Sequence, residues 1–376
     1  MRILTAAAMM AALVAAVSCE GQSASTAPQA CAGLRRPGVP LAFMPARAPS
    51  VARARCIGVQ YAAVIGRLGW GRLPRIMRRG NANLQAWQQR SLLYACDRCG
   101  LAGFGLAWVR AHHPTWIMHS AQGTEIHPDD HPDWVLLNFT DPKYQNAWGV
   151  HVRKSLAAGG WTGVELIDAD NDPDWSDEPI DPATHELMTD GNRRRYLANA
   201  LALIRATLKT QGGYSLLAEN GPPTVVSFDQ INSTDAVTVG DGFAHLSGAA
   251  WETQLNYFQK AGGWESGVYV RDEPGLARAE TVYGLAAFML VAIPRDSAYA
   301  GSGSAGSSVY QISPGATPTE PATKHGEIWM RAYPNGVVAV NPSDVAGSVA
   351  MGSAGQVTIP PRSAAIETGG HLVTSG

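Results

Sequence analysis

Short apolar runs alternate with longer amphipathic segments through the middle of the chain. Val164, Leu166 and Ile167 form a compact apolar run that is typical of a buried strand. Residues 142–156 before it repeat apolar positions at helical spacing, and Gly159-Gly160 ends that pattern. Helix followed by strand is the repeating unit of a parallel α/β fold. The pattern therefore predicts βα units.

The same alternation extends over most of the chain and predicts a (β/α)8 TIM barrel. We expect strands at 56–65, 103–109, 134–138, 164–167, 214–220, within 236–247 and at 267–273, and a last helix and strand within 279–293. Helices are expected at 84–96, 142–156, 192–209 and 251–261. Eight such strands would close a barrel whose C-terminal rim carries the chemistry.

The end of the chain has a different pattern. Residues 301–325 are rich in Gly, Ser, Thr and Pro and predict a loop. Residues 327–333 and 337–341 flank a Pro-Asn-Gly turn, which is a clear hairpin signal, and short strands follow at 356–359 and 363–366. We therefore expect a small antiparallel β module at 326–368 after a barrel at 56–300.

The N-terminus predicts an exported protein. The apolar run of residues 3–17 after Arg2 reads as a signal peptide, and residues 20–55 read as a linker rich in Ala, Pro and Ser. Residues 16–19 resemble a lipobox, in which Cys19 would carry a lipid. The chain would then be a lipoprotein of the bacterial cell envelope, with membrane attachment through Cys19, or an extracellular protein.

Charge and cysteine content indicate which partners and metals the chain lacks. The 376 residues carry a net charge of −2, which provides no field for gathering nucleic acid. Without Cys19 the cysteines form an even set, and the simplest disulfides are Cys31 with Cys56 and Cys96 with Cys99. The residues around Cys96 and Cys99 lack the further ligands that a zinc site needs. We expect a monomer with no metal and no cofactor.

Acidic residues follow two of the predicted strands directly. Asp168 stands at the end of the fourth strand and Glu219 near the end of the fifth, with Asp170 close by. Glycoside hydrolysis requires two carboxyl groups, one to protonate the leaving oxygen and one to attack the sugar or activate water. We therefore expect Asp168 to be the nucleophile or base, Glu219 the acid and Asp170 an auxiliary residue. Asp241, Asp272, Glu273 and Glu165 are reserves for the acid role.

Several stretches resemble a known family, the exported barrels of hypothetical glycosyl hydrolase family fifteen, and more distantly the polygalactosaminidase-type barrels. The stretches that carry the resemblance are residues 113–116, 136–142, 163–171, 218–221 and 338–343. The family's fourth-strand motif resembles Gly-Val-Phe-Leu-Asp-Asp-Val-Asn. Here Ala169 separates the two acids, so either Asp168 or Asp170 takes the place of the family acid.

We interpret the chain as a glycoside hydrolase that acts on an extracellular polysaccharide or cell-surface glycan. Aromatic, amide and acidic side chains near predicted loops and strand ends are the expected substrate contacts: Trp108, Trp116, Asn138, Asn171, Trp175, Asn220, Asp272 and Glu273. Two alternatives stay open. One is an inactive carbohydrate-binding barrel, and the other is a metal-dependent hydrolase that uses the acidic loop from Asp168 to Asp174.

Overall fold

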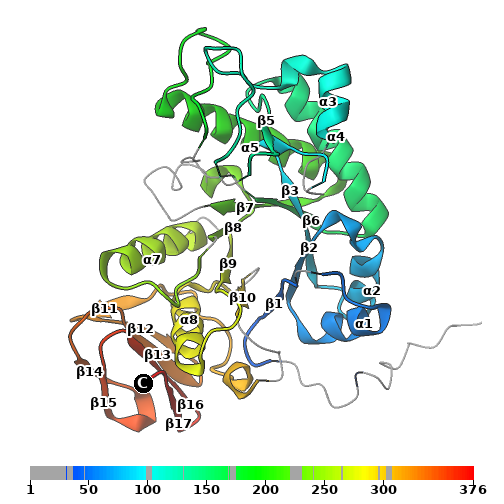
Figure 1. The fold of residues 1–376 in the computed structure, drawn as a ribbon. Helices are drawn as coiled ribbons and strands as arrows, with labels where there is room; N and C mark the ends of the chain where they lie inside the picture. Colours follow the sequence, from blue (N-terminus) through cyan, green and yellow to red (C-terminus); the bar gives the residue numbers. More distant parts are fainter. Residues whose placement is uncertain are drawn as a thin grey trace, which may run out of the picture.

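The computed structural model describes residues 31, 37–45, 47–98, 104–129, 131–167, 169, 175–220, 231–239, 241–263, 266–294, 297–301 and 307–376. Eight parallel strands form one sheet in the order β1-β2-β3-β6-β7-β8-β9-β10. A parallel bridge between Leu41 and Tyr299, beside the ends of β1 and β10, closes this sheet into a barrel (Figure 1). The predicted (β/α)8 barrel is confirmed.

The barrel strands are short and the helices between them are longer. The strands are β1 Ala42–Phe43, β2 Ala63–Gly66, β3 Gln85–Ser91, β6 Gly163–Ile167, β7 Ser215–Asn220, β8 Ala236–Val239, β9 Gly267–Arg271 and β10 Ala298–Ala300. The helices around them are α1 Val51–Gln60, α2 Leu73–Gly80, α4 Pro142–Gly159, α5 Asp190–Gly212, α7 Gly248–Gly263 and α8 Arg278–Val291. Single 3₁₀ turns lie at η2 Leu68–Trp70, η4 Ile231–Ser233 and η5 Ser308–Gln311.

Side chains of alternating strand positions fill the barrel. Trp87 and Tyr269 meet edge to face inside it, with ring centroids 5.8 Å apart, and Leu217 packs in the same cluster. Small side chains complete the interior: Ala42, Ala63, Ala236, Ala298 and Ala300. Their neighbours in sequence face the helices and belong to the larger core. The interior is therefore a packed core, and space for a ligand is confined to its ends.

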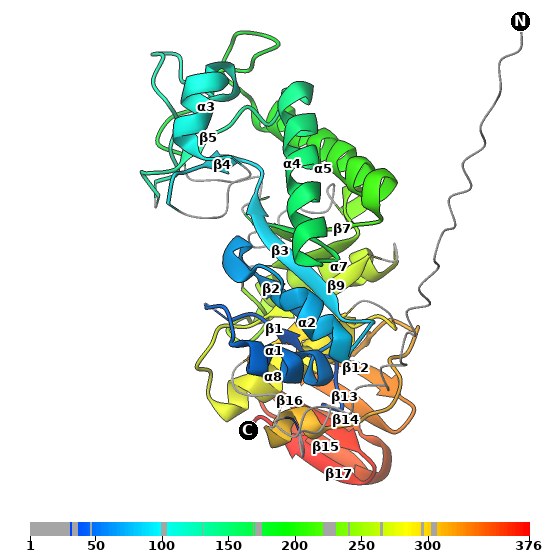
Figure 2. The same ribbon diagram turned by 90° about the vertical axis from the view of Figure 1, so that its right-hand side faces the viewer.

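A long excursion separates β3 from α4. It contains β4 Tyr94–Ala95, α3 Leu106–His112, η3 Pro114–Trp116 and β5 Val135–Leu136, and β4 and β5 pair antiparallel outside the barrel. The excursion lies at the opposite end of the molecule from the C-terminal module (Figures 1 and 2). Among the described residues, no helix is both long and apolar enough to cross a membrane.

The predicted C-terminal module is an antiparallel sheet of five strands with an attached hairpin. The sheet contains β11 Thr323–His325, β12 Ile328–Tyr333, β13 Gly336–Asn341, β16 Ser363–Thr368 and β17 His371–Thr374. β14 Gly347–Ala350 and β15 Gln356–Ile359 form the hairpin, with η6 Gly352–Ala354 between them. The expected hairpin around the Pro-Asn-Gly turn is β12 and β13.

The sequence misassigned the first third of the barrel. Residues 84–96, predicted as a helix, form β3 and β4, because burial on both faces of the sheet overrides the helical propensity of that stretch. The described part of the stretch predicted as a strand at 103–109 is not a strand, since α3 begins at Leu106. β1 and the first half of α1 lie where the sequence indicated a linker, and the second half of α1 occupies the start of the stretch predicted as the first strand.

Two later strands were also misplaced. Residues 134–138 contain only the two-residue β5, which pairs with β4 and contributes nothing to the barrel. Residues 279–293 are occupied by α8, and the eighth strand follows at Ala298–Ala300. The number of barrel strands before Asp168 is nevertheless the predicted one. The strand before Asp168 is still the fourth of the barrel, and the strand that carries Glu219 is still the fifth.

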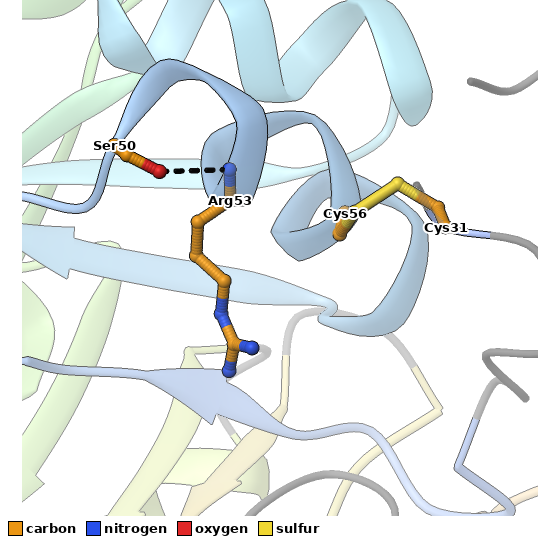
Figure 3. Close-up of a disulfide and its surroundings, with 4 residues drawn as sticks. All are labelled: Cys31, Ser50, Arg53 and Cys56. Carbon is orange, nitrogen blue, oxygen red and sulfur yellow. Dashed lines mark hydrogen bonds between the residues drawn. A yellow bond between two sulfur atoms is a disulfide. The ribbon is translucent and has the colours of Figure 1, made fainter. Parts of the chain in front are cut away.

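A disulfide links Cys31 to Cys56 on α1, as predicted (Figure 3). Beside it, the hydroxyl of Ser50 caps α1 by accepting a hydrogen bond from the Arg53 amide at 3.2 Å. Cys96 is also disulfide-bonded, while its predicted partner Cys99 lies outside the described residues. The first disulfide therefore attaches residue 31 firmly to the first helix of the barrel.

Arg331 on β12 joins the module to the barrel. Its guanidinium is buried and donates to the carbonyl oxygens of Met289 at 3.1 Å and Ala292 at 2.5 Å, at the end of α8. It also donates to the carbonyls of Pro318 and Glu320, both at 2.8 Å. A single side chain therefore satisfies carbonyls that the end of a helix leaves without partners.

Arg331→Met should destabilise the protein by about 3 kcal/mol, because several buried carbonyls would lose their donor. The free energy of unfolding from urea denaturation measures this loss. Asp344→Ala is the matched control, because Asp344 pairs with Arg362 on the surface and such pairs contribute roughly 0–1 kcal/mol. Equal losses in the two variants would contradict the assigned role of Arg331.

Candidate active site

Charged side chains occupy the interior of the barrel near its C-terminal rim. Glu165 on β6 is in register with Leu217 on β7, and Leu217 faces the barrel interior. Glu219 lies two residues further along β7, and Arg271 lies two residues beyond Tyr269 on β9. Because side chains alternate along a strand, all three point inward.

Glu219 and Arg271 form an ion pair across the barrel mouth. Arg271 Nη2 donates to Glu219 Oε1, and the side chains are only 27% and 13% exposed for Arg271 and Glu219. The strand between them, β8, contributes Thr238 in register with both Glu219 and Tyr269. The pair therefore spans β8 and is largely shielded from water.

Arg271 is held charged by several acids. Its burial disfavours the cation, but Glu219, Glu165 and Asp241 outweigh this effect, so that the pKa of Arg271 is raised. Glu165 is fully buried on the neighbouring strand of β7. The mouth thus contains a partly buried cation with three carboxylates near it.

Asp272 is the next residue after Arg271 and makes a different set of contacts. It accepts hydrogen bonds from the Tyr299 hydroxyl at 2.6 Å and from the Ala244 amide at 2.9 Å. A Cβ atom on Gly242 or Gly284 would come within 2.2 Å of its carboxylate oxygens, so both positions require glycine. Burial raises the pKa of Asp272, although these hydrogen bonds act against the shift. Asp272 fixes the loop after β8 beside the mouth.

A cavity of about 600 Å³ opens at the rim, and of the ion pair Arg271 lines it whereas Glu219 does not. It is lined by the ends of β1, β9 and β10, by α1 and by the loop after β8, with polar contributions from Arg53, Asp241, Arg271, Asp272 and Glu273. Tyr61, Tyr299 and Tyr310 add aromatic surface. The cavity thus combines apolar walls with a few converging charges, as ligand sites do.

Other predicted site residues lie outside the described part of the chain or are only partly described. Asp168, Asp170 and Asn171 are outside the described residues, as is the acidic loop up to Asp174. Asn220 is the last residue of β7, and only its backbone is described. Glu273 is at the cavity with a largely exposed side chain, 4.0 Å from His245. Within the described residues, no group of His, Cys, Asp and Glu is arranged to hold a metal ion.

The predicted aromatic contacts lie in the excursion, away from the cavity lining. Trp108 stacks on Phe104 and His112, with ring centroids 5.0 and 5.2 Å away, and 40% of its surface remains exposed. Trp116 is buried and stacks on His113 at 3.9 Å. Burial indicates a packing role for Trp116, whereas the role of the exposed Trp108 in substrate contact stays a prediction.

Trp175 and Asn138 are likewise engaged with the protein. Trp175 Nε1 donates to the Tyr94 hydroxyl at 2.9 Å, and the guanidinium of Arg193 lies 5.3 Å from its ring. Asn138 Oδ1 accepts from the Thr140 hydroxyl at 2.6 Å and thereby orders the turn before α4. Neither residue lines the cavity.

The residue that sequence reasoning missed is Arg271. The sequence predicts a strand at 267–273 and assigns possible roles only to the two acids at its end, Asp272 and Glu273. An arginine at the same strand parity as Tyr269 was the available signal, because an inward-facing cation in a barrel needs acidic partners. Glu165, expected only as a reserve for the acid role, belongs to the same interior group.

Comparison with known proteins places the chain among sugar-cleaving barrels. The family model "Hypothetical glycosyl hydrolase family 15" matches residues 101–337. No curated protein sequence matches the chain.

Solved structures resemble the chain only distantly in sequence. The glycoside hydrolase domain of PelA from Pseudomonas aeruginosa is 13% identical with a TM-score of 0.45, over 72% of this chain and 96% of that domain. A cycloalternan-degrading enzyme from Trueperella pyogenes is 12% identical with a TM-score of 0.51, over 90% of this chain and 59% of its own. The α-galactosidase AgaA of Geobacillus stearothermophilus is 11% identical with a TM-score of 0.50, over 82% of this chain and 49% of its own. The last two likenesses agree with the barrel fold.

The raised pKa of Asp272 predicts a pH-dependent cost to stability. The folded state binds the proton more tightly than the unfolded state, so stability falls as the pH rises from about 4, the pKa of an unfolded Asp, through the folded-state pKa. Asp272→Asn cannot ionise and should lose this part of the slope. Urea denaturation of the wild type and of Asp272→Asn between pH 4 and pH 8 tests whether the free energy of unfolding falls with pH as predicted. A difference between them that is constant with pH would refute it.

Proposed function

The chain belongs to hypothetical glycosyl hydrolase family 15, and from this premise we propose that it hydrolyses an extracellular polysaccharide or cell-surface glycan by a two-carboxylate mechanism. Family membership identifies it as a glycoside hydrolase. The proposed pair is Asp168, which follows β6 directly in sequence, and Glu219 on the adjacent strand β7. The observation that carries the proposal is Glu219 inside the barrel mouth, paired with Arg271.

The ion pair supports a specific division of roles. In a pair with arginine, Glu219 is a carboxylate, which is the form that attacks an anomeric carbon or deprotonates water. A general acid must instead carry a proton. We therefore assign Glu219 the role of nucleophile or base and Asp168 the role of acid, the reverse of the assignment that the sequence alone suggested. Arg271 then orients Glu219 as a positioning residue.

The cavity that Arg271 lines is the proposed sugar site. Its charged residues and tyrosines could bind hydroxyl groups and cover ring faces, and it opens at the barrel rim, where enzymes of this fold carry out their chemistry. Asp272 and Glu273, both expected as substrate contacts, line this cavity. The aromatic residues of the excursion are not part of this proposal.

The proposed location is outside the cytoplasm. The disulfide between Cys31 and Cys56 supports it, because such bonds persist mainly in oxidising compartments. The apolar N-terminal run and the lipobox-like residues 16–19 are consistent with export and with lipid attachment at Cys19. Mass spectrometry of the exported protein tests whether Cys19 is its first residue and carries a lipid.

Both carboxylates should be required for activity. On the glycan that the wild type cleaves in a panel of polysaccharides, Asp168→Asn and Glu219→Gln should each lower kcat by roughly 10²–10⁴-fold. Glu327→Gln is the control, because Glu327 is an exposed acid of the C-terminal module. Wild-type rates in either catalytic variant would remove that residue from the mechanism.

An activated substrate distinguishes the two roles. A nitrophenyl glycoside of the same sugar has a good leaving group and needs little protonation, so Asp168→Asn should recover most of its activity on it. Glu219→Gln should stay inactive, because attack on the sugar is still required. The opposite result, recovery by Glu219→Gln alone, would restore Glu219 as the acid.

A further inference from the structure

Positive and negative charges are segregated along the chain. Residues 21–96 contain eleven Arg and no Lys, Asp or Glu. Residues 97–376 contain 17 Lys and Arg against 30 Asp and Glu. The net charge of −2 therefore conceals a strongly basic first quarter followed by an acidic remainder.

The fold places six of these arginines on two neighbouring barrel helices and the loop between them. α1 and α2 lie side by side (Figure 2), and Gly80 at the end of α2 packs against the Arg55 carbonyl oxygen on α1. Six exposed arginines of these helices and of the loop between them form what we call the arginine face: Arg53, Arg55, Arg67, Arg72, Arg75 and Arg79.

Nothing acidic neutralises the arginine face within the described structure. Other cations have partners, such as Arg205 and Lys209, which both bind Asp235. By contrast, among the described residues no carboxylate forms an ion pair with the six arginines. The guanidinium of Arg75 instead donates hydrogen bonds to the carbonyl oxygens of Ala157 and Ala158. The next helix, α4, contains no acid either and adds Lys154.

The chain preceding the barrel arrives at this same flank. Cys31 is bonded to Cys56, which is on α1 (Figure 3). In sequence, Cys31 lies only twelve residues after Cys19, the proposed site of lipid attachment. A fully extended segment of that length spans roughly 40 Å. A lipid on Cys19 would therefore hold α1 near the membrane surface.

We propose that the arginine face docks on the anionic headgroups of a phospholipid membrane. Arginine suits this partner because its planar guanidinium binds phosphate through two hydrogen bonds. Each basic residue near an anionic leaflet strengthens binding, and the attraction decays within a Debye length. The flank is a row of helices with cations spread along it, which matches an extended charged surface.

Docking would also orient the catalytic mouth. Barrel helices run roughly along the barrel axis, so a molecule lying on α1 and α2 has its mouth opening sideways. Arg53 lies both on the arginine face and in the cavity lining. The cavity would therefore open just above the headgroups, into the space where envelope glycans lie.

Vesicle co-sedimentation tests the proposal. The exported form with Cys19→Ser carries no lipid, and it should bind vesicles of phosphatidylcholine and phosphatidylglycerol but not of phosphatidylcholine alone. The triple variant Arg55→Gln, Arg72→Gln, Arg79→Gln should bind about tenfold more weakly or worse. It spares Arg53, at the cavity, and Arg75, which bonds the end of α4.

Controls separate the face from net charge and from misfolding. A second triple variant, Lys143→Gln, Lys260→Gln, Arg278→Gln, removes the same charge from exposed positions elsewhere and should bind as the wild type does. Replacing Arg55, Arg72 and Arg79 by Lys keeps the charge and should preserve most of the binding. Binding by this variant would show that the loss in the Gln variant comes from the missing charge and not from a folding defect. Equal loss in the two Gln triples would overturn the proposal. So would binding to an acidic polysaccharide with none to anionic vesicles.

Discussion

The ion pair between Glu219 and Arg271 is the interaction on which the active-site account depends. A guanidinium inside a barrel is tolerated only when carboxylates compensate its lost hydration. Here three acids provide that compensation: Glu165 on β6, Glu219 on β7 and Asp241 after β8. The same requirement that stabilises Arg271 therefore brings several acids to the barrel mouth and fixes the orientation of Glu219.

The surroundings of this pair are built to be rigid. Below it, Trp87, Leu217 and Tyr269 fill the barrel, so that the charged layer rests on a packed floor. Beside it, Asp272 is enclosed by glycines and bonded to Tyr299, which also takes part in closing the barrel. Rigid support of this kind keeps catalytic groups in place without reorganisation during the reaction.

The sequence predicted the second half of the barrel better than the first. Apolar, partly β-branched runs such as 164–167 identified their strands, and Asp141 and Gly160 delimit α4 as expected. By contrast, β3 is rich in Gln and has no β-branched residue, so only its tertiary pairing makes it a strand. β1 has two residues and carries no periodicity at all. For the site, Glu219 could be predicted from its position at a strand end. Its pairing with Arg271 could not, because the two residues are 52 positions apart in sequence and meet only through the arrangement of the barrel strands.

A double-mutant cycle on the unfolding free energy tests the central claim most directly. Glu219→Gln, Arg271→Met and the double variant would be compared with the wild type by urea denaturation. A shielded pair predicts a coupling free energy above about 1 kcal/mol, the upper end for exposed pairs. Losses that add within ~0.5 kcal/mol would contradict the account, because independent residues show no more coupling than that.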